Sequence, residues 1–436
     1  MKLPENLIGR NQDVEAIRRL AETGACVSLV GISNLGKSAL MRQLTQSPSQ
    51  GTFVYVDCNQ MPERTGRALF VAIWHALSAR LSTSELRAGA QHLYESMVAA
   101  PSNMTAALNF EAGLAFAFEH LATPLVFCLD DFDEAYRDLE PQTFLNLRAY
   151  KDQFGARLAY VTATERELAR LPQSREQGEF LELVAPHTHM MHFLQLTESR
   201  AFCDFVAARE KVSFSDTDIE FIHANADGHP GLIQAVCYVL TQVAGASKPG
   251  KQQERIIHQL VQQNLADDVN VQSECKKIWD DLDPEEHAAL LNFDAADAAS
   301  PAQRRLRAKF IVRADAEDAK IFCRLFADFV RRVKITQAHK ASGVYIDGGD
   351  VWVDGNRIEA LTDLEYRLLE FLYGKMDRVC DKYSIVENVW GQQFIDEVDD
   401  ARIEKLVSRV RQKIEPDAAH PRYLVSLRGR GYKLTR

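Results

Sequence analysis

The sequence predicts a multidomain protein in which an α/β domain with a parallel sheet comes first and a small α+β domain comes last. The chain has 436 residues, more than one hydrophobic core usually holds, which favours three or four domains. Over residues 1–195, short apolar runs alternate with helical stretches, the pattern typical of a parallel sheet. From residue 339 onward, short strands and glycine turns lead instead into helices and a terminal hairpin pattern.

The composition is that of a globular protein without a membrane segment. Hydrophobic residues make up 46% and charged residues 26% of the chain. No apolar run approaches the about 18 residues of a membrane span, and the N-terminal segment lacks the apolar centre of a signal peptide. Eight cysteines are scattered singly, which indicates reduced, buried thiols and a cytoplasmic location. The net charge of −10 argues against nucleic-acid binding along the whole chain but leaves room for one basic face.

The first element with recognisable chemistry is a phosphate-binding loop, GISNLGKS, at residues 31–38. The run ACVSLV before it predicts a buried strand, and KSALMRQL at its end has helical spacing. A loop in this position can hold phosphate oxygens through backbone N–H groups and the helix dipole. Lys37 would supply a charge for the β- and γ-phosphates, and Ser38 a hydroxyl for Mg²⁺. The candidate nucleotide contacts of the loop are Gly31, Asn34, Gly36, Lys37, Ser38 and Ala39.

A second buried strand, at residues 125–129, ends in two carboxylates. We expect Asp130 to hold Mg²⁺ through water, and Asp131 to orient or deprotonate the attacking water. Glu134 is the reserve candidate for the base. The run DDFDE would also suit a solvated acidic turn, and only the phosphate loop upstream favours the metal site.

Two further strands are predicted at residues 52–58 and 157–164. The second leads into TATER, so Thr162, Thr164 and Arg166 are candidates to reach the γ-phosphate, although an ordinary polar strand end explains them equally well. Arg166 therefore joins Asp131 and Glu134 as a candidate catalytic residue. The histidines of HTHMMH (187–192) have no cysteine or carboxylate close in sequence, and we favour an exposed sheet strand there over a metal site.

The middle of the chain predicts helices with one strand pair. Residues 196–265 are helical in pattern and open on Thr197 as an N-cap. Over residues 266–338, helices end in a strand pair, which favours a small winged-helix-like module. No internal repeat of 20–50 residues is visible, so a long repeat array that acts as a sensor is not expected.

The last domain has the pattern of a DNA reader. Thr362 and Glu365 have capping-box spacing, and the helix at 400–414 carries an apolar stripe opposite a cationic face. A hairpin around RGRG follows. The candidate DNA contacts are Arg402, Lys405 and Arg409 on the helix, and Arg428 and Arg430 at the hairpin tip. Residues 342–436 hold 15 Lys and Arg against 17 Asp and Glu, so one copy should bind DNA weakly, and a protein-binding role stays open.

Two family resemblances follow from these motifs. LIGRNQDVEAI, GISNLGKS, LVFCLDDFDEA, VTATER and ADGHPGLIQAVC occur in the order seen in STAND-type P-loop NTPases, which are AAA+ relatives that act as signalling switches. This resemblance spans residues 6–335 and implies ATP or ADP with Mg²⁺. It also implies that Arg10 lies near the base and that His229 and Pro230 contact the nucleotide from a helical lid.

The C-terminal part resembles the OmpR/PhoB-type winged-helix domain in LTDLEYRLLEFL, VENVWG, RIEKLVSRVRQKIEP and PRYLVSLRGRGYKL. That resemblance implies double-stranded DNA as a partner. In this family the last long helix reads bases and the hairpin contacts the backbone.

The resulting domain boundaries are a P-loop NTPase domain over 1–195, a helical lid over 196–265, a winged-helix-like module over 266–338 and the DNA-binding domain over 339–436. We expect a slow ATPase that serves as a switch for transcription, with nucleotide-dependent self-association, a protein partner as a source of the signal and no membrane. Two alternatives stay open. One is a DNA-associated ATPase in remodelling or anti-phage defence. The other is nucleotide-driven assembly in which the terminal domain binds protein.

Overall fold

A computed structural model describes residues 9–46, 49–81, 84–172, 174–244, 251–293, 300–314, 319–340, 342–358, 361–395 and 397–435. Residues 1–8 of the first predicted domain lie outside these ranges. The chain divides into two compact units, Met1–Phe329 and Val330–Arg436, and each is described by itself. No helix within the described ranges is long and apolar enough to cross a membrane. All eight cysteines are buried and unbridged, as predicted.

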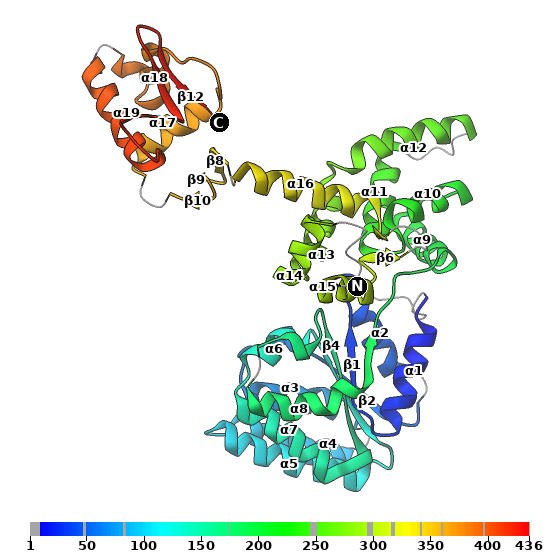
Figure 1. Ribbon diagram of the computed structural model, residues 1–436. Helices are drawn as coiled ribbons and strands as arrows, with labels where there is room; N and C mark the ends of the chain where they lie inside the picture. The colour runs from blue at the N-terminus through cyan, green and yellow to red at the C-terminus, as the bar shows by residue number, and fades with distance from the viewer. Residues whose placement is uncertain are drawn as a thin grey trace. The chain divides into compact units, whose positions relative to one another are not determined.

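A five-stranded parallel sheet forms the centre of the first domain (Figure 1). Its order is β2-β3-β4-β1-β5, and all its pairings are parallel. The carboxyl ends of the strands therefore share one edge, which is where α/β sheets bind ligands. The predicted strands are confirmed. Their bounds are β1 Val27–Val30, β2 Thr52–Asp57, β3 Leu125–Asp130, β4 Leu158–Thr164 and β5 Thr188–Met190.

Helices cover this sheet, and aromatic side chains fill the layer between them. Phe70 of α3 stacks on Phe110 of α5 with ring centroids 4.8 Å apart, and Phe110 also contacts Phe127 of β3. This layer holds β3 in place and so fixes where its acidic end lies. The helices are α1 Asn11–Glu22, α2 Lys37–Gln46, α3 Gly66–Ser78, α4 Ser84–Val98, α5 Asn103–His120, α6 Phe132–Asp138, α7 Pro141–Phe154 and α8 Arg175–Val184.

Four helices follow: α9 Leu196–Glu210, α10 Asp216–Ala226, α11 Pro230–Ala244 and α12 Lys251–Leu265. The prediction that Thr197 caps the first of them is wrong. The cap is Gln195, whose backbone N–H donates to the Glu198 carboxylate at 2.7 Å. Because an acidic residue three positions on can reach back to this N–H, the helix begins earlier than a search for a hydroxyl cap indicates.

The middle part contains helices that lead into a short antiparallel hairpin, as the sequence predicted. Its elements are α13 Val269–Asp280, α14 Pro284–Leu291, α15 Pro301–Ala308, β6 Val312–Ala314, β7 Ala319–Ile321 and α16 Arg324–Lys340. Glu286 of α14 is fully buried, and its carboxylate lies 2.7 Å from the Lys309 ammonium at the end of α15. This buried ion pair ties the two helices together.

The second unit is a small α+β domain. Its elements are β8 Val344–Asp347, β9 Asp350–Val353, β10 Asn356–Arg357, α17 Asp363–Tyr373, α18 Lys382–Val389, α19 Asp400–Ile414, β11 Leu424–Leu427 and β12 Gly431–Leu434. The predicted capping box of Thr362 and Glu365 is present. The predicted apolar stripe of α19 is fully buried in the core of this unit, and consists of Ile403, Leu406, Val407, Val410 and Ile414.

Candidate nucleotide site and nucleic-acid surface

The phosphate loop joins β1 to α2 at the carboxyl edge of the sheet. Gly36 has a φ of +94°, a conformation that favours glycine, and its missing Cβ would meet nothing within 4 Å. The Lys37 ammonium is buried and donates to the backbone carbonyls of Gly31 at 2.7 Å and Ile32 at 3.4 Å. The Gly31 N–H donates to the Thr164 carbonyl at 3.1 Å, which ties the loop to β4.

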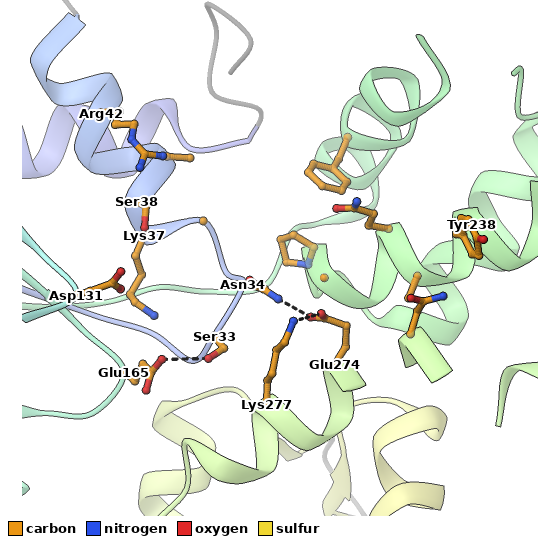
Figure 2. A pocket seen from close by; sticks show the side chains of 18 residues that line it. Ser33, Asn34, Lys37, Ser38, Arg42, Asp131, Glu165, Tyr238, Glu274 and Lys277 are labelled. Atoms are coloured by element: carbon orange, nitrogen blue, oxygen red, sulfur yellow. Dashed lines mark hydrogen bonds and ion pairs between the residues drawn. The ribbon is translucent and has the colours of Figure 1, made fainter. Parts of the chain in front are cut away.

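A cavity of about 670 Å³ opens in front of the loop (Figure 2). Its other walls come from α9, α11 and α13, so it lies between the sheet domain and the helices that follow it. Pockets of this size accept cofactor-sized ligands. The predicted nucleotide and catalytic residues that line it are Asn34, Gly36, Lys37, Ser38, Ala39, Asp131 and Pro230.

Asp130 ends β3 as a buried carboxylate with two donors. The Tyr55 hydroxyl of β2 donates to its Oδ2 at 2.7 Å, and the Asp131 backbone N–H donates to its Oδ1 at 3.1 Å. Burial, and next the charge of Asp130, raise the pKa of Tyr55 well above its usual value, so the phenol remains a donor. A serine hydroxyl at the start of α2 and this carboxylate are the oxygen ligands that Mg²⁺ prefers, so the residues present fit a magnesium–nucleotide complex.

Of the two candidate bases, only Asp131 reaches the cavity. Asp131 adopts a left-handed conformation, with φ of +49°, and accepts a hydrogen bond from Asn59 at 3.0 Å. Burial and then the neighbouring Asp130 raise the pKa of Asp131. The Glu134 carboxylate instead accepts from Arg64 at 2.8 Å and is not among the residues that line the cavity.

Arg166 does not line the cavity either. Its guanidinium donates to the backbone carbonyls of Asp280, Asp281 and Leu282 at 2.6, 2.9 and 3.1 Å, at the C-terminal end of α13. The Thr164 hydroxyl donates to the Arg166 carbonyl at 2.7 Å. The TATER segment (162–166) therefore binds the C-terminal end of α13 through Arg166.

Arg10, which the family resemblance placed near the base, is enclosed behind the phosphate loop. Its side chain is 2% exposed, and its guanidinium donates to the Leu35 carbonyl at 3.2 Å and lies 3.5 Å from the Asp13 carboxylate. Asp13 also lies 2.8 Å from the ring nitrogen Nε2 of His189. Within the described part of the chain, no three His, Cys, Asp or Glu side chains are grouped to hold a metal ion.

His229, directly before α11, contacts the tip of the loop. Burial lowers the pKa of His229 to about 4, so its ring is neutral at pH 7. The Leu232 N–H donates to Nδ1 at 3.2 Å, which leaves the proton on Nε2 for donation to the Ser33 carbonyl at 3.0 Å. Gly228 before it has a φ of +83°, and a Cβ there would lie 2.0 Å from the Leu194 carbonyl oxygen, so only glycine fits.

Three carboxylates that the sequence reasoning missed surround the loop tip. The Ser33 N–H and hydroxyl both donate to Asp281, the hydroxyl at 3.1 Å, and this hydroxyl also lies 3.1 Å from Glu165. The Asn34 amide donates to Glu274 of α13 at 2.6 Å (Figure 2). Glu165 lies within the TATER segment, but no local pattern marks the other two, because they follow the loop by about 240 residues.

The contact between Ser33 and Asp281 should depend on pH. Burial, and next the charge of Glu165, raise the pKa of Asp281 from 3.8 to about 7. The folded chain therefore binds more protons here than the unfolded chain between these values, and this contribution to stability falls as pH rises through that window.

We expect the free energy of unfolding of the first unit to fall between about pH 4 and 7, and Asp281→Asn to flatten this slope. Urea titrations of both chains at a series of pH values measure the difference. Equal slopes would contradict the assignment.

In the second unit the five predicted DNA contacts are all exposed. Arg402, Lys405 and Arg409 lie on the outer face of α19, and Arg428 and Arg430 lie in the turn between β11 and β12.

The helix and this hairpin are braced together. Arg411 donates to the Leu424 carbonyl and the Ser426 hydroxyl, each at 2.8 Å. Glu415 accepts from three consecutive backbone N–H groups, at 422–424. The exposed cations therefore project from one rigid surface.

The geometry defines a P-loop nucleotide-binding domain with helical additions, followed by a winged-helix domain. Comparison with known families agrees. Residues 6–161 match the family described as "AAA ATPase domain", and residues 355–434 match "Transcriptional regulatory protein, C terminal". The chain thus joins an AAA ATPase domain to the C-terminal domain type of OmpR/PhoB-like transcriptional regulators.

A curated relative is the uncharacterized transcriptional regulatory protein YrkP of Bacillus subtilis (strain 168), 36% identical over 84 residues, which are 19% of this chain and 36% of that protein. The chain therefore spans about a third of that relative. Among solved structures, the Walker-type ATPase PABY2304 of Pyrococcus abyssi is 13% identical, with coverage of 75% of this chain and 97% of that one and a TM-score of 0.48. The Klebsiella pneumoniae RstA DNA-binding domain in complex with RstA box is 23% identical, with coverage of 22% and 92% and a TM-score of 0.20.

Proposed function

We propose that this protein is an ATP-dependent switch whose nucleotide state controls self-association and DNA binding, and through them transcription. One observation carries the proposal: the middle part of the chain contacts the phosphate loop itself. Asp281 accepts from the Ser33 N–H, and Arg166 donates to the carbonyls around Asp281. A nucleotide that enters the cavity would change the surroundings of the contacts of Ser33 and Arg166 with Asp281. Nucleotide binding would thereby be coupled to the position of the middle part of the chain relative to the phosphate loop.

The loop residues would hold ATP or ADP with Mg²⁺. Lys37 would leave its two carbonyl partners for phosphate oxygens, and Ser38 and Asp130 would face the metal ion. Asp131 would orient the attacking water. We expect slow hydrolysis, because Arg166 is engaged with the middle part of the chain rather than with the cavity.

DNA binding would gain from association of several chains. Residues 342–436 carry a compact cationic surface although they hold 17 Asp and Glu against 15 Lys and Arg, so one copy should bind weakly. Nucleotide-dependent assembly would place several such surfaces on repeated half-sites, and affinity would rise without new contacts. A protein that binds the first unit would supply the signal, and the whole assembly would work in the cytoplasm with the DNA.

Selection of genomic DNA fragments by the purified chain, with ATP, with ADP and without nucleotide, tests this proposal. The expected result is a small set of sequence-related fragments enriched with one nucleotide and not with the other. Enrichment of the same DNA fragments under all three conditions would contradict the proposal that nucleotide state controls DNA binding. A DNA-stimulated ATPase rate of many turnovers per second would favour remodelling of DNA instead.

The double variant Arg409→Ala, Arg430→Ala should lose DNA affinity by about 10-fold or more, since an arginine that contacts a base contributes about 1–3 kcal/mol and loss of a phosphate contact weakens binding further. The slope of log affinity against log salt should also become shallower by about 1–2. Arg378→Ala, outside the predicted surface, is the control. Unchanged affinity of the double variant in a salt titration would show that the reading surface is misassigned.

A further inference from the structure

Asp130 is connected to the cavity wall by two side chains that the proposed function does not use. Arg42 belongs to α2, one helical turn after Ser38, and lines the cavity. Its guanidinium donates to the Tyr55 hydroxyl at 2.9 Å and lies over the Tyr55 ring, 4.9 Å from the centroid. The Tyr55 hydroxyl in turn donates to the Asp130 carboxylate at 2.7 Å. Three elements, α2, β2 and β3, are thus joined by one chain of hydrogen bonds.

The order of donors fixes the direction of this chain. Arginine has donors only, so the Tyr55 oxygen accepts from Arg42 and must use its own proton toward Asp130. Asp130 then receives one donor on each oxygen, because the Asp131 N–H takes the other. A carboxylate held this way has a fixed plane, and its remaining lone pairs point in fixed directions.

From this geometry we infer that Tyr55, held by Arg42, is a positioning residue that sets the affinity of the nucleotide site for Mg²⁺. The inference rests on the proposed nucleotide site and deepens it. A ligand carboxylate that is free to rotate must be ordered when the ion binds, whereas one already oriented is not. Arg42 and Ser38 lie on the same helix, α2. The hydrogen bonds from Arg42 through Tyr55 to Asp130 therefore also link the Asp130 carboxylate to the helix that carries the hydroxyl ligand.

The test is Tyr55→Phe in the full chain, which removes one hydroxyl and leaves the ring. Binding of ADP is measured by calorimetry over a series of MgCl₂ concentrations and again in EDTA. We expect the MgCl₂ concentration for half-maximal tightening to rise about 10-fold, the lower end of the range for partners of metal ligands. ADP affinity in EDTA should be unchanged, which a general folding defect would not leave intact.

Tyr160→Phe is the matched control. Tyr160 lies in the same sheet, on β4, and its buried hydroxyl donates to the Leu147 carbonyl at 2.9 Å, away from Asp130. It should lose stability without any shift in MgCl₂ dependence. An equal MgCl₂ dependence for Tyr55→Phe and Tyr160→Phe would overturn the inference.

The double variant Tyr55→Phe, Arg42→Met tests whether Arg42 acts through Tyr55. The loss of Mg²⁺ affinity should be no greater than in Tyr55→Phe alone, since the hydroxyl that Arg42 holds is already gone. The single variant Arg42→Met is measured beside it. A fold-loss of Mg²⁺ affinity in the double variant equal to the product of the losses in Tyr55→Phe and Arg42→Met would show that Arg42 does not act through Tyr55. These measurements do not involve DNA or assembly, so failure of the inference and failure of the switch are separate results.

Discussion

Lys37→Ala is expected to reduce ATP and ADP affinity by about 10- to 150-fold. The lysine is the cation of the loop, and a hydrogen bond to a charged group contributes about 1.5–3 kcal/mol, which is about 10- to 150-fold in affinity. Its ammonium now lies between the carbonyls of Gly31 and Ile32, so it is already directed into the loop and needs little reordering to meet phosphate. Equilibrium binding of a fluorescent nucleotide to the full chain measures the loss.

Lys277→Ala is the control for this variant. Lys277 also lines the cavity, but its side chain is 47% exposed and its ammonium pairs with Glu274 on its own helix. An ion pair whose cation is this exposed contributes little, so nucleotide affinity should change less than about threefold. If Lys37→Ala and Lys277→Ala weaken nucleotide binding equally, the overall charge of the cavity, and not the phosphate loop, determines nucleotide affinity. Under the proposed switch, Lys37→Ala should also make DNA selection insensitive to ATP.

The fold of the sheet domain was predictable because its signals are local. Apolar runs such as residues 125–129 define strands by length and composition, and the loop motif requires a strand before it and a helix after it. The strand order, with β4 between β3 and β1, leaves no such local trace, because neighbouring strands in a parallel sheet come from distant segments. The cap of α9 was missed for a different reason: Glu198 reaches back to a residue type outside the usual cap set.

The same division applies to the nucleotide site. Lys37, Ser38, Asp130 and Asp131 were each predicted from a short motif, and the structure brings three of them, Lys37, Ser38 and Asp131, to one cavity. Arg166 lies in such a motif as well, yet its guanidinium binds carbonyls more than a hundred residues away. Sequence alone gives the type of a side chain and its place on a strand end, but not which of several nearby partners it binds.

Arg166→Ala is expected to release the middle part of the chain from the phosphate loop. The variant removes three hydrogen bonds to the carbonyls at the end of α13. At about 1 kcal/mol net for each, or about 3 kcal/mol together, the equilibrium between the closed and released arrangements should shift by about 150-fold. Limited proteolysis of the full chain should become faster between residues 266 and 293. Because coupling between sites is reciprocal, a switch that ATP opens should then bind ATP more tightly.

Arg148→Ala separates this effect from a general loss of stability. The Arg148 guanidinium bridges α7 and α8 through the Glu179 carbonyl at 2.9 Å and the carboxylates of Asp152 and Glu182, all within the sheet domain. Its loss should lower stability without exposing residues 266–293, and ATP affinity should stay at the wild-type value. Arg166→Ala should instead give tighter ATP binding and DNA selection that no longer requires ATP. If both arginine variants behave alike, the contacts between Arg166 and α13 are structural only, and the switch must lie elsewhere in the chain.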